Sequence, residues 1–148
     1  DGQYYPFGRL DDGKTYGYMY PDPIKVEGGV IAATDAANFI IALEATEVGF
    51  NIKNALGQYL YMSGTYDSFN VTTEVGTEGY DWTITSAGGS DLFTITNVQK
   101  EKSVKLNYYV NKEGVAQYSF GSYAVSKVSD KTYYTNSLLG DMMSILMV

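Results

Sequence analysis

Two residue types that carry much of protein chemistry are missing from this sequence. Its 148 residues include neither cysteine nor histidine. Without cysteine, the chain can form no disulfide, no thiolate nucleophile and no cysteine-based zinc site. Without histidine, it lacks the commonest general base, the commonest metal ligand and every catalytic triad built on histidine. We therefore expect neither a cofactor nor a bound metal.

Basic residues are also scarce. Ten Lys and Arg residues stand against 17 Asp and Glu residues, which gives a net charge of −7 at pH 7. Nucleic acids and anionic membranes attract proteins through clustered Lys and Arg, and no such run occurs here, so neither is an expected partner. The longest apolar tract, residues 137–148, is interrupted by Gly140 and Asp141. It is shorter than the roughly 20 residues that span a bilayer, so we expect no membrane-spanning segment.

Tyrosine and glycine are abundant instead. The 15 tyrosines and 16 glycines, with many Thr, Val and Ile residues, favour short strands separated by tight turns. A turn of helix is expected only at residues 34–38 and in part of the C-terminal tract. The length is that of one ordinary domain, and the sequence therefore predicts a single all-β domain.

The chain contains an internal repeat with a spacing of 43 residues. The segment KTYGYMY (14–20) matches GQYLYMS (57–63), and the spacing continues further along the chain without a gap. It relates eight residue pairs: Tyr16–Tyr59, Tyr18–Tyr61, Met19–Met62, Phe39–Trp82, Ile41–Ile84, Phe50–Phe93, Ile52–Ile95 and Asn54–Asn97. Such regular self-similarity predicts a duplicated unit of about four strands.

A third, weaker copy follows the first two. In this interpretation VKLNYY (104–109) begins the third unit, FGSYAVS (120–126) replaces the strand of Trp82, and TYYTN (132–136) replaces FTITN (93–97). The units then span residues 14–56, 57–99 and 100–142, after an N-terminal extension of residues 1–13. Three four-stranded units predict a β-trefoil-like single domain over residues 14–148. The alternative is an antiparallel β-sandwich in which the third unit is not equivalent.

Three segments carry a family resemblance. YLYMSGTYDSFNV (59–71), the strand Trp82-x-Ile84 and FTITN (93–97) resemble a β-rich module at the C-terminal end of secreted proteins and lipoproteins of gut Bacteroidetes. The resemblance covers about residues 14–125, and the wider spacing is also similar to ricin-type trefoil domains, whose Gln-x-Trp signature does not occur here. It implies a bacterial, extracytoplasmic accessory domain with no catalytic role.

Repeated residues are expected to be scaffold. Trp82 is the only tryptophan, but it matches Phe39, so we predict that it lies in the core and does not stack on a sugar. Tyr18 and Tyr61 match each other and are assigned to the scaffold for the same reason. Asn54 and Asn97 end equivalent strands, where an Asn side chain can satisfy the backbone of a turn.

Residues without a repeat counterpart are the candidates for a binding site. They are Tyr66, Asp67 and Asn70; Tyr66 and Asp67 follow a strand in a turn bounded by Gly64, and we expect these two to be exposed. A ring there could stack on a sugar while the carboxylate and amide bind its hydroxyls. The alternative is a simple hairpin turn.

A second candidate surface contains Tyr109 and Asn111. Several neighbouring aromatic residues lie close to them in the sequence: Tyr108, Tyr118, Phe120 and Tyr123. The alternative for this cluster is that it forms an irregular core for the third unit.

Nothing in the sequence indicates catalysis. A glycosidase needs two placed carboxylates, one of them with a raised pKa, and Glu74, Glu78 and Asp81 lie in a Gly-rich loop that we expect to be solvated. We predict a non-catalytic, extracytoplasmic binding module, with carbohydrate as the expected ligand. The alternative is a structural or protein-interaction module with no small-molecule ligand. Because the chain begins at Asp1, we expect it to be part of a larger surface or secreted protein. The apolar tail Leu138–Val148 is expected to pack on the domain or on another copy.

Overall fold

The computed structural model describes residues 4–28, 31–86, 92–127, 133–134 and 136–137. The tail Leu138–Val148 lies outside these residues. A single short α-helix, α1 (Ala33–Ala36), continues into the 3₁₀ turn η1 (Ala37–Phe39), where the sequence predicts a helical turn. None of the helices in the described segments is long and apolar enough to cross a membrane.

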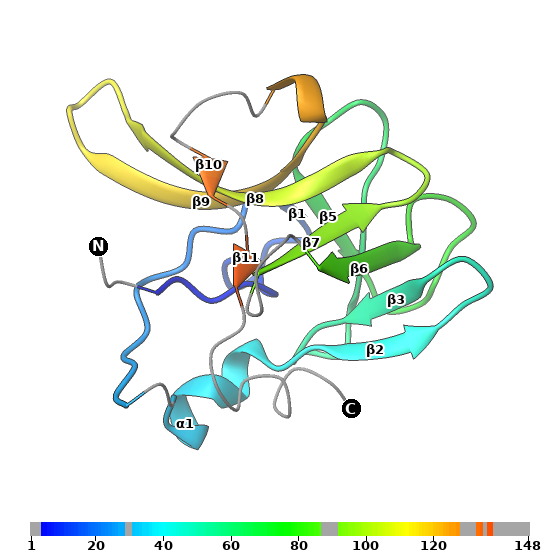
Figure 1. Cartoon of the computed structure of the whole chain (residues 1–148), viewed down its shortest axis with the longest axis horizontal. Helices are drawn as coiled ribbons and strands as arrows, with labels where there is room; N and C mark the ends of the chain where they lie inside the picture. Colours follow the sequence, from blue (N-terminus) through cyan, green and yellow to red (C-terminus); the bar gives the residue numbers. More distant parts are fainter. Residues whose placement is uncertain (1–3, 29–30, 87–91, 128–132, 135, 138–148) are drawn as a thin grey trace.

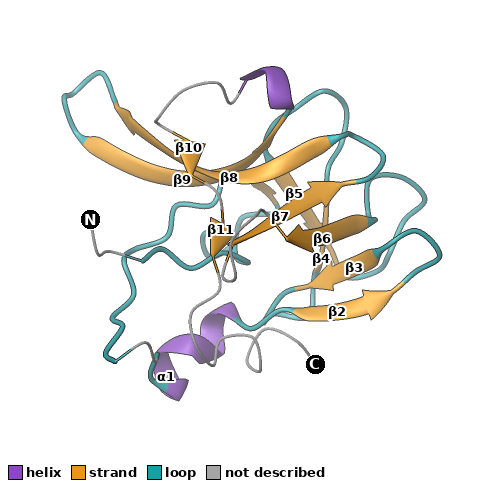
Figure 2. Cartoon of the chain, viewed as in Figure 1, coloured by secondary structure: helices purple, strands orange, loops and turns teal. Residues whose placement is uncertain are grey.

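Apart from a second 3₁₀ turn, the remaining regular elements of the described residues are strands, which confirms the predicted all-β class (Figure 2). They are β1 (Tyr16–Gly17), β2 (Ala42–Ala45), β3 (Phe50–Lys53), β4 (Tyr59–Tyr61), β5 (Phe69–Thr72), β6 (Trp82–Ser86), β7 (Leu92–Asn97), β8 (Lys102–Val110), β9 (Ala116–Tyr123), β10 (Tyr133–Tyr134) and β11 (Asn136–Ser137). A second 3₁₀ turn, η2, covers Val125–Lys127.

These strands form one antiparallel sheet. Its order is β1-β5-β4-β3-β6-β7-β8-β10, while β2 pairs with β3, β9 with β8 and β11 with β7. The long β8–β9 hairpin arches across one side of the molecule, and the β2–β3 hairpin and α1 lie on the opposite side (Figure 1). The last strand of each of the first two repeats pairs with the first strand of the next repeat. These pairs are β3–β4 and β7–β8.

The β2–β3 and β6–β7 hairpins are equivalent, but their registers correct the sequence alignment. Ile52 pairs with Leu43, whereas its counterpart Ile95 pairs with Ile84. The spacing is therefore 43 residues in the second strand of each hairpin and 41 in the first. The matches of Ile41 to Ile84 and of Phe39 to Trp82 are wrong, because at a spacing of 41 Ile41 corresponds to Trp82 and Phe39 lies in η1. The reason is loop length, because four residues separate the paired Ala45 and Phe50 but six separate Ser86 and Phe93. Because side chains alternate between the two faces of a strand, shifting the alignment by two residues does not change which residues face the core.

The third unit is also displaced from its predicted position. In β8–β9, Val104 pairs with Ser122 as Leu60 pairs with Val71 in β4–β5. Residues 120–123 therefore correspond to the strand of Phe69, and the alignment of FGSYAVS with the Trp82 strand is wrong. Likewise Phe93 pairs with Asn136 as Phe50 pairs with Trp82, so the match of residues 132–136 to FTITN is wrong. The cause is that β8 and β9 are 9 and 8 residues long, whereas β4 and β5 have 3 and 4.

The hydrophobic core is built where the repeats meet. Trp82 is fully buried in it, as predicted, and its indole Nε1 donates a hydrogen bond to the carbonyl oxygen of Leu60 (3.1 Å). Phe69 and Phe120 occupy equivalent hairpin positions, and both pack edge-on against Phe7, with ring centroids 5.8 and 5.4 Å away. Leu10 is also buried in this cluster. The predicted N-terminal extension thus contributes side chains to the core from its described part.

Candidate functional site

The candidate site lies on the outer face of the β8–β9 hairpin. Residues 18–20 run beside β9, because Met19 and Phe120 exchange two backbone hydrogen bonds of 3.1 and 2.8 Å. Met19 and Phe120 both point into the core. Since side chains alternate along extended chains, Tyr18 and Tyr20 face the opposite way, on the same side as Ser119.

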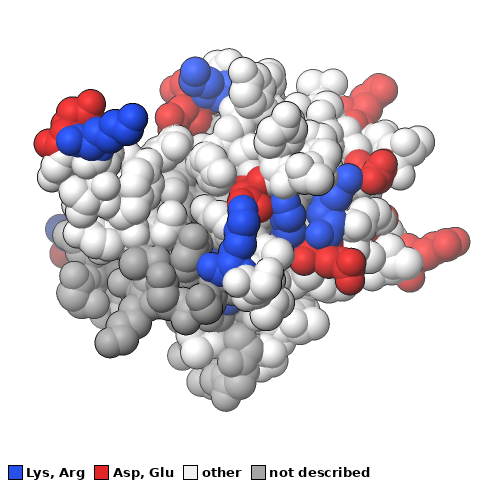
Figure 3. All heavy atoms as spheres, turned by 90° about the horizontal axis from the view of Figure 1, so that it is seen from above, with Lys and Arg blue, Asp and Glu red and all other residues white. Residues whose placement is uncertain are grey.

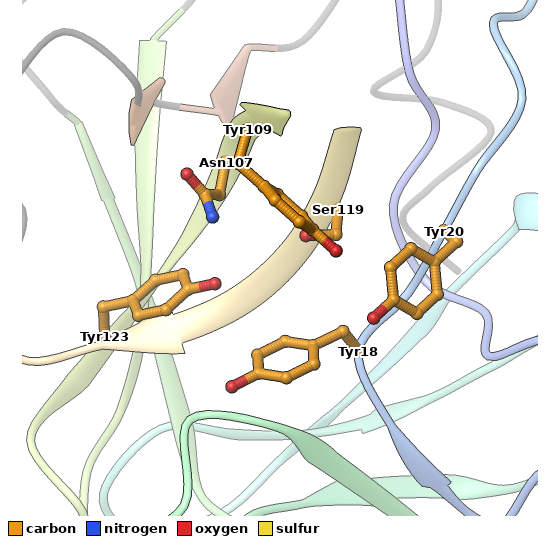
Figure 4. A pocket seen from close by; sticks show the side chains of 6 residues that line it. All are labelled: Tyr18, Tyr20, Asn107, Tyr109, Ser119 and Tyr123. Atoms are coloured by element: carbon orange, nitrogen blue, oxygen red, sulfur yellow. The ribbon is translucent and has the colours of Figure 1, made fainter. Parts of the chain in front are cut away.

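Six side chains on this outer face enclose an open cavity of about 300 Å³, which we call the tyrosine pocket (Figure 4). They come from three adjacent segments: Tyr18, Tyr20, Asn107, Tyr109, Ser119 and Tyr123. Asn107 lies directly opposite Ser119 in the β8–β9 register, and Tyr109 is the next residue on the same face of β8. Period-two alternation on three neighbouring segments therefore assembles the pocket.

The pocket has a buried floor and an exposed rim. Ser119 and Tyr123 are buried, whereas Tyr20 and Tyr109 are 41% and 37% exposed. In Figure 4 the hydroxyls of Tyr20 and Tyr109 point toward each other from opposite sides of the pocket. The rim tyrosines can therefore present both ring surface and hydroxyl groups to a ligand.

A glycine allows the floor to form. Gly121 lies between Ser119 and Tyr123 on the same face of β9, and a Cβ at this position would approach the Tyr123 hydroxyl oxygen to 2.5 Å. The Tyr123 ring therefore lies across the backbone of Gly121. Any larger residue there would push the ring away from the strand.

The pocket lining contains no Asp, Glu, Lys or Arg side chain. Burial raises the pKa of Tyr20 above its ordinary value of 10.0, and the hydrogen bond and nearby charge of Tyr109 raise it further. The other lining groups are an amide, a serine hydroxyl and further tyrosines. On the face seen from above in Figure 3, acidic and basic side chains lie next to each other rather than forming a field of one sign.

Tyr66 and Asp67 lie on a turn outside the pocket lining. Tyr66 is 69% exposed, in agreement with the prediction. The predicted exposure of Asp67 is wrong, because its side chain is only 10% exposed. Its carboxylate lies 2.6 Å from Lys127 Nζ and 3.0 Å from Lys102 Nζ. Lys102 Nζ also donates to the carbonyl oxygens of Thr65 and Tyr66 (2.7 and 2.9 Å). Asp67 therefore braces the turn and is not free to bind a ligand.

The electrostatics of Asp67 reflect this bracing role. Burial alone would raise the pKa of its carboxyl group, but the hydrogen bonds and charges of Lys127 and Lys102 outweigh that effect and lower it. Asp67 is thus held as a carboxylate between two ammonium groups. Its backbone oxygen also accepts a hydrogen bond from Ser122 N (2.8 Å), which fastens the turn to β9.

The predicted asparagines divide between turns and sheet. Asn111 Oδ1 accepts hydrogen bonds from Glu113 N and Val115 N (3.0 and 2.9 Å), so its side chain acceptor serves the β8–β9 turn. Asn54 Oδ1 holds the β3–β4 turn in the same way, and Asn97 Oδ1 accepts from the backbone of the β7–β8 turn. The turn role predicted for Asn54 and Asn97 is confirmed. Asn70 lies on β5, where its Nδ2 donates to Ser63 Oγ (3.2 Å).

Of the five predicted site residues, the structure therefore places only Tyr109 in the tyrosine pocket. Tyr123 belonged to the surrounding aromatic cluster, while Asn107 and Ser119 were missed. The match of Tyr18 to Tyr61 predicts that Tyr18 is scaffold, and no pattern in the sequence predicts a role for Tyr20. Their alternation with Met19 was visible in the sequence, but the pairing of residues 18–20 with β9 was not.

The acidic residues of the Gly-rich loop make local contacts. Glu78 pairs with Lys100 (2.8 Å), and Asp81 Oδ2 accepts a hydrogen bond from Gln99 Nε2 (2.7 Å). Within the described residues, no three acidic side chains gather in a group that could hold a metal ion.

Comparison with known proteins adds no relative. No protein-family model, no curated protein sequence and no solved structure matches the chain. The arguments for function therefore come from the pocket and its surroundings.

Proposed function

We propose that this protein is a non-catalytic carbohydrate-binding module and that the tyrosine pocket is its site. The observation that carries the proposal is the joint placement of four tyrosines with Asn107 and Ser119 around one open cavity. Aromatic rings supply flat apolar surface for the C–H faces of sugars, and tyrosine hydroxyls, an amide and a serine hydroxyl can bind sugar hydroxyls. Binding sites commonly combine ring surface with a few convergent polar groups in this way.

The chemistry of the lining favours a neutral glycan. All six lining side chains are uncharged types, so a sulfate, phosphate or carboxylate would find no counter-charge among them. The net charge of −7 adds a repulsive field against acidic polymers. A ligand with many hydroxyl groups and no charge fits the pocket better.

The setting of the module is part of the proposal. An extracytoplasmic, bacterial location within a larger surface or secreted protein is suggested by the sequence resemblance of residues 14–125. A β-trefoil-like arrangement of the three units is supported by the equivalent pairings β3–β4 and β7–β8. It is also supported by the equivalent pairs Phe50–Trp82 and Phe93–Asn136.

Affinity electrophoresis tests the proposal with few assumptions. The protein is run through gels that contain a neutral polysaccharide (starch, galactomannan, xylan or mixed-linkage β-glucan) or an acidic one (pectin or hyaluronan). We expect retardation by at least one neutral polysaccharide. Tyr109→Ala should lose it, whereas Tyr66→Ala, which removes an exposed tyrosine outside the pocket, should keep it. Loss in Tyr66→Ala alone would move the site to the predicted turn, and no retardation in any gel would favour the protein-interaction alternative.

A further inference from the structure

A second aromatic surface adjoins the tyrosine pocket through one short segment. Residues 16–20 first pair with β5, where Tyr16 lies opposite Asn70 and Gly17 opposite Phe69. The same segment then pairs with β9 through Met19 and Phe120. It therefore bridges the β4–β5 and β8–β9 hairpins, which are equivalent elements of neighbouring repeats.

Three residues form a row across the first hairpin. Asn70 is paired with Tyr16 on one side and with Tyr61 on the other, so the three side chains lie on one face of the sheet. We call them the Tyr16 row. Tyr16 is 71% exposed, and Tyr61 is held in place by stacking on Tyr80, with centroids 4.5 Å apart and planes 10° from parallel. The row thus offers ring surface and an amide, as the pocket does.

The bridging segment supplies tyrosines to both surfaces. Gly17 and Met19 are paired with the core residues Phe69 and Phe120. Tyr18 and Tyr20 flank Met19 and lie on the outer side of β9. Tyr16 faces outward with its partner Asn70, and Gly17, with a φ of +134°, turns the chain between the two hairpins. Tyr16 belongs to the row, while Tyr18 and Tyr20 line the pocket. The two surfaces are therefore consecutive along the segment, and each lies on the side of its own hairpin that faces away from the core.

We propose that the tyrosine pocket and the Tyr16 row are two subsites of one extended site. The site takes a linear, neutral polysaccharide whose chain follows residues 16–20, rather than a single sugar or a chain end. The inference rests on the proposed function. It is carried by the continuity of residues 16–20, which supply side chains to both surfaces, by the uncharged residue types of both surfaces and by the open form of the cavity.

Isothermal titration calorimetry with oligosaccharides of increasing length tests this inference. The probes are the cello-, xylo- and malto-oligosaccharides from disaccharide to hexasaccharide, titrated into the wild type, Tyr16→Ala and Tyr109→Ala. We expect affinity to rise with length for the series that binds. Tyr16→Ala should weaken binding of the hexasaccharide about three- to tenfold, the loss expected for one aromatic contact, and leave the disaccharide unchanged. Tyr109→Ala should weaken both.

Two outcomes separate the inference from the function on which it rests. If Tyr16→Ala binds the hexasaccharide as the wild type does while Tyr109→Ala is weakened, the site ends at the pocket and the inference is wrong. If no series binds the wild type, the proposed function itself fails. Tyr66→Ala is the matched control, because it removes an equally exposed tyrosine elsewhere, and it should leave every affinity unchanged. Since Tyr16 is exposed, its substitution should leave the melting temperature unchanged.

Discussion

The Tyr123 ring lies across Gly121, so that a Cβ on this glycine would come within 2.5 Å of the tyrosine hydroxyl. Glycines in strands weaken a sheet, and an aromatic ring laid over them restores part of the lost packing. Here the same contact shapes a pocket. The backbone of Gly121 is not in the left-handed region, so space and not conformation is what requires glycine at this position.

Gly121→Ala should therefore displace the Tyr123 ring. We expect a loss of about 1–3 kcal/mol in the free energy of unfolding, which is typical of overpacking. Glycan affinity should fall as well, because the ring forms the pocket floor. Urea denaturation measures the first effect, and gel retardation by the polysaccharide that binds the wild type measures the second.

A double-mutant cycle shows whether this contact is the cause. In a Tyr123→Ala background, Gly121→Ala should become neutral or slightly stabilising, because alanine restricts the unfolded chain and no longer meets a ring. An equal loss of stability in both backgrounds would show that Gly121 is required for some other reason.

Asp67→Asn should destabilise the protein. The substitution removes a carboxylate that is only 10% exposed and that pairs with both Lys102 and Lys127. Hydrogen bonds to charged groups contribute about 1.5–3 kcal/mol, and we expect a loss of this order in the free energy of unfolding. Glu78→Gln is the control, since it also removes an acid paired with a lysine, but the Glu78 side chain is 69% exposed and pairs with Lys100 alone, so it should change stability little. Similar losses in both variants would contradict a bracing role for Asp67.

The same carboxylate predicts a pH dependence. The pKa of Asp67 is lowered in the folded protein below its ordinary value of 3.8, so its contribution to stability is present above that value. It is lost as the pH falls through 3.8 and on through the lowered pKa. The melting temperature of the wild type should therefore fall more steeply with decreasing pH than the melting temperature of Asp67→Asn. If the melting temperatures of the two proteins fell in parallel below pH 3.8, the lowered pKa of Asp67 would be contradicted.

Asn111 should matter for stability and not for binding. Asn111→Ala removes the acceptor of two backbone hydrogen bonds and should cost about 0.5–2 kcal/mol in the free energy of unfolding. Asn111→Asp keeps a side-chain oxygen acceptor and should recover most of that loss. Neither variant should alter gel retardation by a polysaccharide. A large change in retardation with unchanged stability would return Asn111 to the list of ligand contacts.

Trp82 offers a test of the core. Trp82→Phe removes the donor to the Leu60 carbonyl and leaves a gap in the core, so we expect a loss of about 2–4 kcal/mol in the free energy of unfolding. Because Trp82 is the only tryptophan, the emission of the wild type reports on it alone. The emission should be blue-shifted and poorly quenched by acrylamide. Emission typical of a solvated indole would contradict its burial.

The all-β class could be predicted because strand signals are local. Alternation in Trp82-Thr83-Ile84 and the 43-residue spacing identify hairpins without knowledge of the fold. Register could not be predicted in the same way. The extra two residues between Ser86 and Phe93 shift β6 without changing which face its residues occupy, so a gapless alignment fits the sequence and misplaces the strand.

The candidate site was less predictable than the fold. Tyr66 and Asp67 stand out in the sequence because they do not repeat, but the ion pairs that bury Asp67 come from Lys102 and Lys127 in another unit. The tyrosine pocket instead depends on the pairing of Met19 with Phe120, which joins segments far apart in the chain. The predicted burial of Trp82 is confirmed, although Phe39, the counterpart from which it is predicted, lies in η1 and not in the equivalent strand. Repetition misled at Tyr18, whose backbone is scaffold while its ring lines the pocket.

The most direct measurement of the central claim is an NMR titration of tyrosine ring signals. Protein with labelled tyrosine rings, assigned through single Tyr→Phe variants, is titrated with cellohexaose, xylohexaose and maltohexaose. We expect one of these neutral sugars to shift the ring signals of four tyrosines saturably, while the signal of Tyr66 stays in place. The four are Tyr18, Tyr20, Tyr109 and Tyr123. Shifts confined to Tyr66, or no saturable shift at the four pocket tyrosines with any of the three sugars, would contradict it.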